Sequence, residues 1–253
     1  MRKLNIKGIK YAMEDPSAAI KFILSGKDKA NVLCLRRIAV SLGFSKMVVD
    51  TYLNKILSDE DFHHNVWSKL HRLNYSGWID FPQGLYTLIR LLKPEIVVET
   101  GVAAGVSSAY ILKALEENDN GELLSIDFPN YELNYFPKLG LNPVSILPDG
   151  KEPGFAVPAE LRHRWHLKLG KKSQEILPQL LKEFGNCDCF LHDSEHTYKN
   201  MMFEYREAWR HLRNGGLLLS DNIFMNSAFH DFSKLTARKP FYVYFAGWGC
   251  IIK

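Results

Sequence analysis

The residues in this chain that could do chemistry are mostly acids that directly follow short apolar runs. Carboxylates at such positions can bind ligand hydroxyl groups, neutralise a cation or ligate a metal. Glu99 and Asp127 end the first two runs, and Asp193 and Asp221-Asn222 end two later ones. His196 lies three residues after Asp193, and an imidazole titrates near neutrality, which suits a general base.

The periodicity of the apolar residues predicts the helices and strands that position these side chains. Short β-branched runs alternate with helical stretches after residue 90, which predicts a Rossmann-like, doubly wound α/β fold with a mostly parallel seven-stranded sheet. The sequence predicts strands at 96–99, 123–127, 166–169, 187–192 and 217–221, and a terminal antiparallel hairpin at 241–245 and 249–252. Helices are predicted at 107–117, 174–183 and 198–213, with Asn214-Gly215-Gly216 ending the last one.

The first 75 residues have a different pattern. Their apolar residues recur at helical spacing, so we expect an N-terminal helical extension at 1–75 and a second domain at 76–253. Within the extension, Ala39, Gly43 and Val49 have the spacing of a helix-turn-helix, with Arg36 nearby. A role in reading DNA and a role as a helical cap or subunit contact are both compatible with it. An apolar extension is also compatible with a homodimer.

A cofactor site is expected where the first strand ends, because ligands of open α/β sheets bind at the carboxyl ends of the strands. Gly101 allows a tight turn and Gly105 allows a close backbone approach, although helix packing also needs glycine. Asp127 is placed to accept hydrogen bonds from ribose hydroxyls. A dinucleotide site would favour Gly-x-Gly-x-x-Gly, whereas Glu99 would repel pyrophosphate and suits a cationic amino-acid group. The loop therefore favours S-adenosylmethionine over NAD.

At these residues the chain resembles the class I S-adenosylmethionine-dependent methyltransferases over about residues 80–253. The resemblance implies that the Glu99-x-Gly101-x-x-x-Gly105 loop holds the methionine part, and Ser107 and Asp193 are further candidates for binding the cofactor. It also implies that Asp127 binds the ribose. The segment 170–178 resembles the adenine-flanking segment of catechol-type O-methyltransferases, which implies that Ser173 and Gln174 contact the base. Most members of that family have one residue fewer between the positions of Gly170 and Ser173.

The acids that end the fourth and fifth strands favour a divalent cation. Adjacent parallel strands would bring Asp193, Asp221 and Asn222 together, and two carboxylates with an amide oxygen suit Mg²⁺. Such a metal could lower the pKa of a substrate hydroxyl, with His196 taking its proton. The chain resembles the metal-dependent catechol-type and natural-product O-methyltransferases at these positions. Structural alternatives are a cofactor contact for Asp193, a turn for Asp221-Asn222 and a helix cap for His196.

Two neighbours and one long connection complete the predicted site. His192 and Glu195 are candidates for supporting roles around it. The connection 128–164 holds six prolines and several aromatic residues, which is typical of a lid or binding loop as well as of an ordinary surface loop. We expect these segments to shape the pocket for a small hydroxylated methyl acceptor.

Composition sets wide limits on function. The chain has 253 residues, of which 46% are hydrophobic and 24% charged, which excludes disordered, collagenous and coiled-coil chains. A net charge of +4 is too small to indicate nucleic acid or an anionic membrane as partner. The absence of a long apolar run, of a signal-peptide pattern and of a cysteine framework predicts a cytoplasmic enzyme. A metal-independent methyltransferase, a nucleotide-sensing nucleic-acid-binding regulator and an NAD-dependent oxidoreductase are the alternatives.

Overall fold

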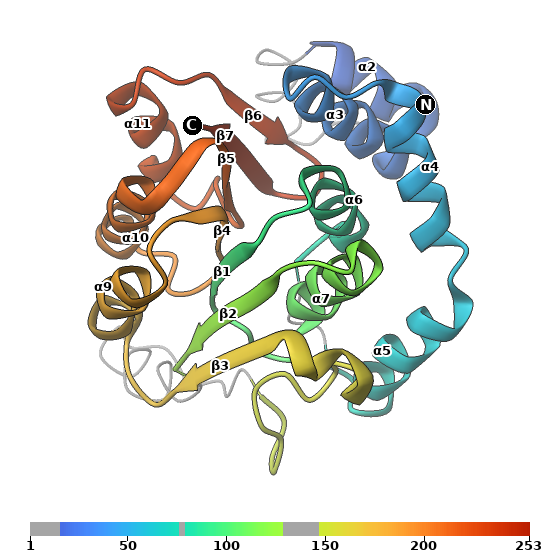
Figure 1. Ribbon diagram of the computed structural model, residues 1–253. Coiled ribbons are helices and arrows are strands. Elements are labelled where there is room, and N and C mark those ends of the chain that lie inside the picture. Colours follow the sequence, from blue (N-terminus) through green and yellow to red (C-terminus); the bar gives the residue numbers. More distant parts are fainter. Residues whose placement is uncertain (1–15, 76–78, 129–146) are drawn as a thin grey trace, which may run out of the picture.

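The computed structural model describes residues 16–75, 79–128 and 147–253, and its core is one β-sheet (Figure 1). The strands in these residues are β1 (Ile96–Thr100), β2 (Glu122–Asp127), β3 (Trp165–Leu169), β4 (Cys187–His192), β5 (Leu212–Ser220), β6 (Pro240–Val243) and β7 (Trp248–Ile252). Their order in the sheet is β3-β2-β1-β4-β5-β7-β6. Strands β1 to β5 pair in parallel, and β7 is antiparallel to both β5 and β6. The predicted doubly wound sheet with a terminal hairpin is confirmed.

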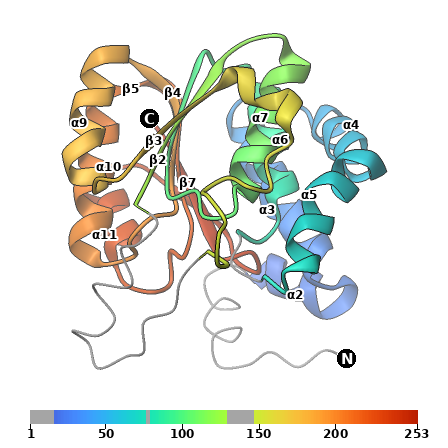
Figure 2. The same ribbon diagram turned by 90° about the horizontal axis from the view of Figure 1, so that it is seen from below.

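Helices cover both faces of the sheet. They are α6 (Pro82–Leu92), α7 (Val106–Asn118), α9 (Ser173–Phe184), α10 (Tyr198–His211) and α11 (Ala228–Leu235), with a short 3₁₀-helix, η2 (Ala159–Arg164), before β3. Figures 1 and 2 show α9, α10 and α11 on one face and α6 and α7 on the other. Neighbouring residues of one strand belong to different cores: Val97 packs on the α6–α7 side and Val98 on the α10 side. This alternation follows from the pleat of the strand.

The register brings the carboxyl ends of four strands to one edge of the sheet. Thr100 of β1 lies opposite Ile126 of β2 and His192 of β4, and His192 lies opposite Ser220 of β5. The residues that follow these positions are therefore neighbours in space. They are Gly101, Asp127, Asp193 and Asp221.

In the described part of the N-terminal region, residues 16–75, four helices lie outside α6 and α7 (Figure 2). They are α2 (Pro16–Ser25), α3 (Lys27–Ser41), α4 (Lys46–Leu57) and α5 (Glu60–Arg72). Their buried residues, such as Leu35 and Leu53, belong to the same apolar cluster as Leu85 of α6 and Ala109 of α7. The helical character of this region is confirmed for residues 16–72. The division into two domains at residue 75 stays a prediction.

The helix-turn-helix spacing corresponds to α3, a turn and α4. Gly43 in the turn has a φ of +89°, a left-handed conformation that glycine adopts without strain. Ala39 and Val49, on either side of it, are both fully buried. The side chain of Ser45 caps α4 by accepting the amide N–H of Val48. The two-helix arrangement is confirmed, and a role in nucleic-acid binding stays a prediction.

One predicted boundary was wrong. The helix expected at 198–213 ends at His211, and Asn214-Gly215-Gly216 lies inside β5 instead of ending the helix. The register between β4 and β5 shifts between Cys187 and Cys189, and a Cβ on Gly216 would lie 2.7 Å from the carbonyl oxygen of Asp188. Glycine is therefore needed here because two strand backbones approach closely at an irregularity, not because a helix ends.

The proline-rich connection is described only in its second half. Residues 129–146, with Tyr131, Tyr135 and Phe136, lie outside the described residues, as does Trp78. Residues 147–158 lead into η2 and β3. Among the helices that the structure describes, none is both long and apolar enough for a membrane span.

Candidate active site

Glu99 is a buried acid whose oxygens are occupied by serine hydroxyl groups. Ser107 donates to Oε1 at 2.5 Å, and Ser108 and Ser125 donate to Oε2 at 2.6 and 2.7 Å. Burial raises the pKa of Glu99, and the three hydroxyl donors oppose that effect. The carboxyl group therefore joins β1, the start of α7 and β2. The predicted roles of Glu99 and Ser107 in binding the cofactor stay predictions.

The two glycines of the predicted cofactor loop are needed for contacts within the protein. Gly101 and Gly105 have φ values of +85° and +86°. A Cβ on Gly101 would lie 2.0 Å from the backbone oxygen of Asp193, and one on Gly105 would lie 2.7 Å from Cα of Gly154. Both glycines thus stand where two chain segments cross. The close-packing alternative explains them, and a direct cofactor contact stays a prediction.

Asp127 holds the same loop from the end of β2. Its Oδ2 accepts the backbone N–H groups of Val102 at 3.0 Å and Ala103 at 2.7 Å. Burial raises the pKa of Asp127, and these N–H donors oppose that effect. Ala103 has a left-handed φ of +47°, so the carboxylate stabilises a strained turn. The role of Asp127 in binding ribose stays a prediction.

The end of the proline-rich connection lies directly on this loop. The N–H of Gly154 donates to the carbonyl of Ala103 at 2.8 Å, and that of Ala156 donates to the carbonyl of Ala104 at 2.9 Å. Phe155 between them lies edge-on to Tyr75, with ring centroids 6.1 Å apart. This segment therefore covers the predicted cofactor loop and connects it to the N-terminal helices.

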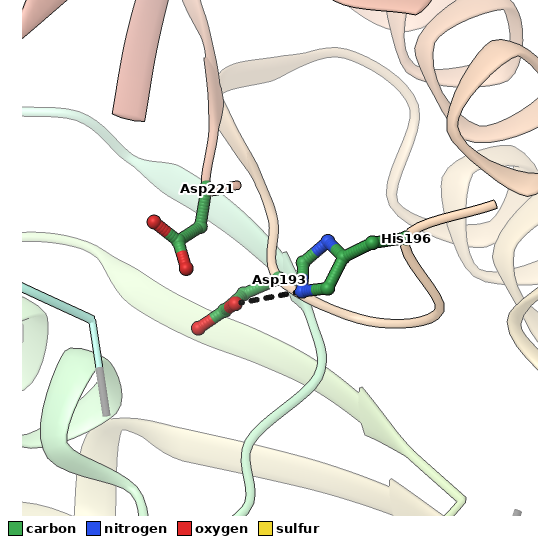
Figure 3. Close-up of side chains that lie close together, drawn as sticks. All are labelled: Asp193, His196 and Asp221. Carbon is green, nitrogen blue, oxygen red and sulfur yellow. Dashed lines mark ion pairs between the residues drawn. The ribbon is translucent and has the colours of Figure 1, made fainter. Parts of the chain in front are cut away.

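Asp193, His196 and Asp221 come together at the ends of β4 and β5 (Figure 3). One side-chain ligand atom from each lies within 4.8 Å of the others. His196 Nε2 is 3.6 Å from Asp193 Oδ1. The strand ends fix both acids, because the N–H of Asp193 donates to the carbonyl of Thr100 at 2.7 Å and that of Asp221 donates to the carbonyl of His192 at 2.8 Å. The predicted convergence of these side chains is present.

Burial raises the pKa values of both carboxyl groups of this pair, and a hydrogen bond between them opposes that effect at Asp221. Burial raises the pKa of Asp193 well above its usual value, and the neighbouring carboxylate of Asp221 adds to the effect. Burial also raises the pKa of Asp221, to about 6. Two acids in this position compete for one proton near neutral pH, so a cation between them would stabilise both charges.

His196 and Asn222 complete this cluster. Burial lowers the pKa of His196 to about 3, so its imidazole is neutral at physiological pH. The amide Nδ2 of Asn222 is 3.1 Å from His196 Nε2 and 3.0 Å from Asp221 Oδ2. Because the amide donates to Nε2, this nitrogen carries the lone pair, and it faces the acids (Figure 3).

A second buried acid, Glu204 on α10, connects the strand ends beneath the cluster. Thr100 Oγ1 and His192 Nδ1 lie 2.6 Å from its Oε2, and Ser194 Oγ lies 2.7 Å from its Oε1. Glu204 is fully buried. Burial alone would raise its pKa, but His192 and the hydroxyl donors lower it to about 2. Glu204 is therefore ionised, and it fixes the residues that flank Gly101 and Asp193.

The residues predicted to flank adenine reach the same network. Ser173 Oγ and Gln174 Nε2 both donate to Asn200 Oδ1, the former at 3.5 Å, and Asn200 Nδ2 donates to Glu204 Oε1 at 3.1 Å. Their contact with a base stays a prediction. Glu195 accepts from the hydroxyl of Thr197 at 2.9 Å, at the start of α10.

Sequence reasoning missed Glu204, although a signal was present. Met201, Tyr205 and Ala208 form the apolar face of α10, and Glu204 lies on that face, three residues after the first and four before the last. A charged residue at a buried helical position needs a partner. His192, a polar residue at the end of a buried strand, was the available candidate.

Comparisons with known proteins agree with this architecture. Residues 98–223 match a family model described as a methyltransferase domain. That range extends from β1 to the residues after Asp221, and it contains the predicted cofactor loop and the acidic cluster. The chain is a class I S-adenosylmethionine-dependent methyltransferase.

Solved structures share the fold at low sequence identity. An O-methyltransferase from Bacillus cereus in complex with S-adenosylhomocysteine is 15% identical, with a TM-score of 0.54 over 81% of this chain and 97% of that one. TomG from Streptomyces achromogenes, an O-methyltransferase involved in tomaymycin synthesis, is 18% identical, with a TM-score of 0.54 over 81% and 95%. A methyltransferase from Geobacter sulfurreducens is 16% identical, with a TM-score of 0.52 over 81% and 94%. No curated protein sequence matches this chain.

Proposed function

We propose that this methyltransferase acts on a hydroxyl oxygen of a small molecule and uses a divalent cation, Mg²⁺ being the first candidate. The observation that carries the proposal is the convergence of Asp193, Asp221 and His196 within 4.8 Å at the strand ends. Glu99 and Asp127, at the neighbouring strand ends, belong to the predicted cofactor side. The acceptor hydroxyl would therefore lie near the methyl group, between the Asp193–Asp221 pair and the predicted cofactor residues Glu99 and Asp127.

The donor set fits a hard divalent cation. Asp193 and Asp221 supply carboxylate oxygens, and their raised pKa values reflect a pair that lacks a compensating charge. Asn222 faces the pair with its amide nitrogen, so it would ligate a cation through its oxygen after a rotation of the amide group. The same rotation would end its hydrogen bond to His196 Nε2 and leave that lone pair available to the acceptor hydroxyl. When bound, such a cation would lower the pKa of a substrate hydroxyl and stabilise the resulting oxyanion.

His196 would take the proton from the acceptor hydroxyl. Its imidazole is neutral, and the lone pair on Nε2 faces the acid pair. Protonation of a buried imidazole is costly, but the Asp193 carboxylate at 3.6 Å would stabilise the imidazolium. When bound, S-adenosylmethionine would supply a sulfonium methyl group to the deprotonated acceptor oxygen. The protein's remaining contribution is to hold the acceptor oxygen in line with that group.

The cofactor residues would act through the loop between β1 and α7. Asp127 keeps Oδ2 on the backbone N–H groups of Val102 and Ala103, and the backbone of Phe128 also forms a hydrogen bond to the carboxylate. The ribose hydroxyls would donate to the remaining lone pairs of this carboxylate. Glu99 would act by holding Ser107 and Ser108 at the start of α7. Ser173 and Gln174 would border the base from α9.

The experiment is a turnover assay with purified protein, S-adenosylmethionine and a panel of catechols and other hydroxylated small molecules. Release of S-adenosylhomocysteine is followed with Mg²⁺ and with excess EDTA. We expect turnover with at least one acceptor, its loss in EDTA and its return with excess Mg²⁺. A panel without turnover would contradict the acceptor class. Turnover that persists in metal-free protein would instead support the metal-independent alternative.

Two variants test the base. His196→Gln should remove most of the turnover at neutral pH, and His196→Lys should retain part of it with the pH profile shifted to higher pH, since lysine is the stronger base. Asp119→Asn, whose side chain is 98% exposed, is the matched control and should behave as wild type. An unchanged rate in His196→Gln would remove His196 from the proposed mechanism.

A further inference from the structure

Trp165, the first residue of the edge strand β3, contacts two segments that flank the predicted cofactor loop. The rest of β3 contributes little to the core, because His166, Lys168 and Leu169 are exposed. The indole of Trp165 is partly buried, and both its ring and its N–H group contact other segments. Each of these contacts begins a chain of interactions that ends at the start of α7.

The first chain runs through Gly154, in the proline-rich connection. A Cβ on Gly154 would lie 2.1 Å from Cη2 of Trp165, so the indole ring lies directly against the α-carbon of this glycine. The same α-carbon is the atom that a Cβ on Gly105 would approach to 2.7 Å. Gly154 therefore contacts both the indole ring and Gly105, the N-cap residue of α7, while its N–H group holds the carbonyl of Ala103.

Arg162 holds the ring and Gly154 together. Its Nη2 donates to the carbonyl of Gly154 at 2.8 Å. Its guanidinium group lies over the Trp165 ring, 5.6 Å from the centroid. A cation that binds a carbonyl and an aromatic face at once restrains both groups. The contact between Trp165 and Gly154 is therefore fixed by a third side chain.

The second chain runs through the indole N–H group and Ser125 of β2. Trp165 Nε1 donates to Ser125 Oγ at 2.9 Å, and Ser125 Oγ donates to Glu99 Oε2 at 2.7 Å. Because an indole N–H group can only donate, it directs the single hydroxyl hydrogen of Ser125 to Glu99. Glu99 in turn accepts the hydroxyl groups of Ser107 and Ser108, in the first turn of α7.

We propose that Trp165 is a positioning residue for S-adenosylmethionine, which holds the cofactor loop and the start of α7 through Gly154 and through Ser125 and Glu99. The inference rests on the predicted cofactor loop at 99–105 and is independent of the proposed metal and methyl acceptor. A role limited to packing would not need the indole N–H group on a fully buried hydroxyl. A loop and a helix start that are held in place bind a ligand with less loss of conformational freedom.

S-adenosylhomocysteine is the probe for the test, and its affinity is measured by isothermal titration calorimetry. Trp165→Phe removes the N–H donor and the part of the ring that lies on Gly154, so binding should be roughly tenfold weaker. Ser125→Ala interrupts only the second chain and should weaken binding about fivefold. Adding Trp165→Phe to Ser125→Ala should cost only about twofold more, because the bond to the indole is already absent.

Trp209→Phe is the matched control. Trp209 is a partly buried tryptophan in the last turn of α10, next to the amino end of β5 and thus at the edge of the sheet opposite to the cofactor loop. Denaturant unfolding gives the loss of stability of each variant. Trp209→Phe should bind S-adenosylhomocysteine as wild type whatever stability it loses. Trp165→Phe should bind weakly at a temperature where it is fully folded.

Wild-type affinity in Trp165→Phe would overturn the proposal, as would an equal loss of affinity in Trp209→Phe. A double variant weaker by the product of the single effects, about fiftyfold, would contradict the chain through Ser125. If Trp165→Phe does not fold, Ser125→Ala decides, and wild-type affinity there overturns the proposal.

Asp127→Asn in the same series separates this inference from the predicted loop. Weak binding in Asp127→Asn beside wild-type binding in Trp165→Phe would make only the role of Trp165 wrong. Wild-type binding in both variants would make the predicted cofactor loop wrong as well.

Discussion

The acids at this edge of the sheet form two groups that differ in what surrounds their oxygens. Glu99, Asp127 and Glu204 are held by hydroxyl, imidazole or backbone N–H donors of the protein. Asp193 and Asp221 face each other instead. Burial raises the pKa values of both, and the charge of Asp221 adds to the effect at Asp193. The first group is complete within the fold, whereas the second is short of positive charge.

The difference separates structural acids from candidate ligand-binding acids. A carboxylate whose donors come from three elements stabilises the geometry of those elements. A pair of carboxylates with one proton between them destabilises the protein on its own and is stabilised by a cation. The predictions below test this distinction from the largest expected effect to the smallest.

Asp221→Asn should lower the turnover rate roughly 1,000-fold, because it removes a proposed ligand and its charge. Its affinity for S-adenosylmethionine should stay within about threefold of wild type, since the cofactor loop is untouched. The rate comes from S-adenosylhomocysteine release and the affinity from calorimetry. Asp127→Asn should show the reverse pattern. Equal loss of cofactor binding in both variants would contradict the separation.

Glu204→Gln should destabilise the protein by roughly 3 kcal/mol at pH 7, the usual cost of breaking a buried charged pair. The folded-state pKa of Glu204 is lowered to about 2 from 4.5. Its stabilisation is therefore present above pH 4.5 and is lost as the pH falls toward 2. Denaturant unfolding should thus show a smaller difference from wild type at pH 3 than at pH 7. Glu183→Gln, an exposed site on α9, is the control. A constant difference would rule out the ionised network.

In the same unfolding experiment with EDTA, Asp221→Asn should stabilise the protein, in contrast to the destabilisation expected for Glu204→Gln. The pKa of Asp221 is raised from 3.8 to about 6, so stability is lost as the pH rises from 3.8 through 6. Removing the charge should therefore stabilise metal-free protein at pH 7.5 by about 3 kcal/mol, with no gain at pH 3.5. If Asp221→Asn is less stable than wild type at pH 7.5, Asp221 is a structural acid like Glu99, Asp127 and Glu204.

Ser108→Ala should cost about 1 kcal/mol, the usual value for one buried hydrogen bond. Glu99 Oε2 keeps the hydroxyl of Ser125, so the carboxyl group is not left without a donor. The loss is measured as a shift in the denaturant midpoint. A loss several times larger would mean that Glu99 is less well compensated than its three hydrogen bonds indicate.

The smallest effect concerns proton competition for the cation. With a pKa of about 6, Asp221 must release its proton before it can ligate at acidic pH. The apparent affinity for Mn²⁺ should therefore be about fourfold weaker at pH 5.5 than at pH 7.5. Calorimetry at the two pH values measures this ratio. An Mn²⁺ affinity independent of pH would show that binding of the ion does not displace a proton from Asp221.

Much of this arrangement could be predicted from the sequence because parallel strands share a direction. Once 187–192 and 217–221 are recognised as neighbouring strands, Asp193 and Asp221 must lie at one edge. The strand limits of β4 were predicted without error for the same reason, since an apolar run between turn residues has few alternatives.

What could not be predicted depends on contacts between distant segments. Gly105 looked like a glycine for ligand approach, but its close neighbour is Gly154, from a connection whose path no local pattern fixes. The end of α10 was misplaced because Gly215-Gly216 is typical of a helix stop, whereas here it accommodates a strand irregularity.

Mn²⁺ binding followed by electron paramagnetic resonance tests the central claim most directly, because it needs no knowledge of the methyl acceptor. Wild-type protein is titrated with Mn²⁺ at pH 7.5 beside Asp193→Asn, Asp221→Asn and the exposed-site control Asp119→Asn. The account predicts one site that Mg²⁺ displaces, affinity at least roughly tenfold weaker in both cluster variants, and an unchanged control. Equal Mn²⁺ affinity in all four proteins would contradict it.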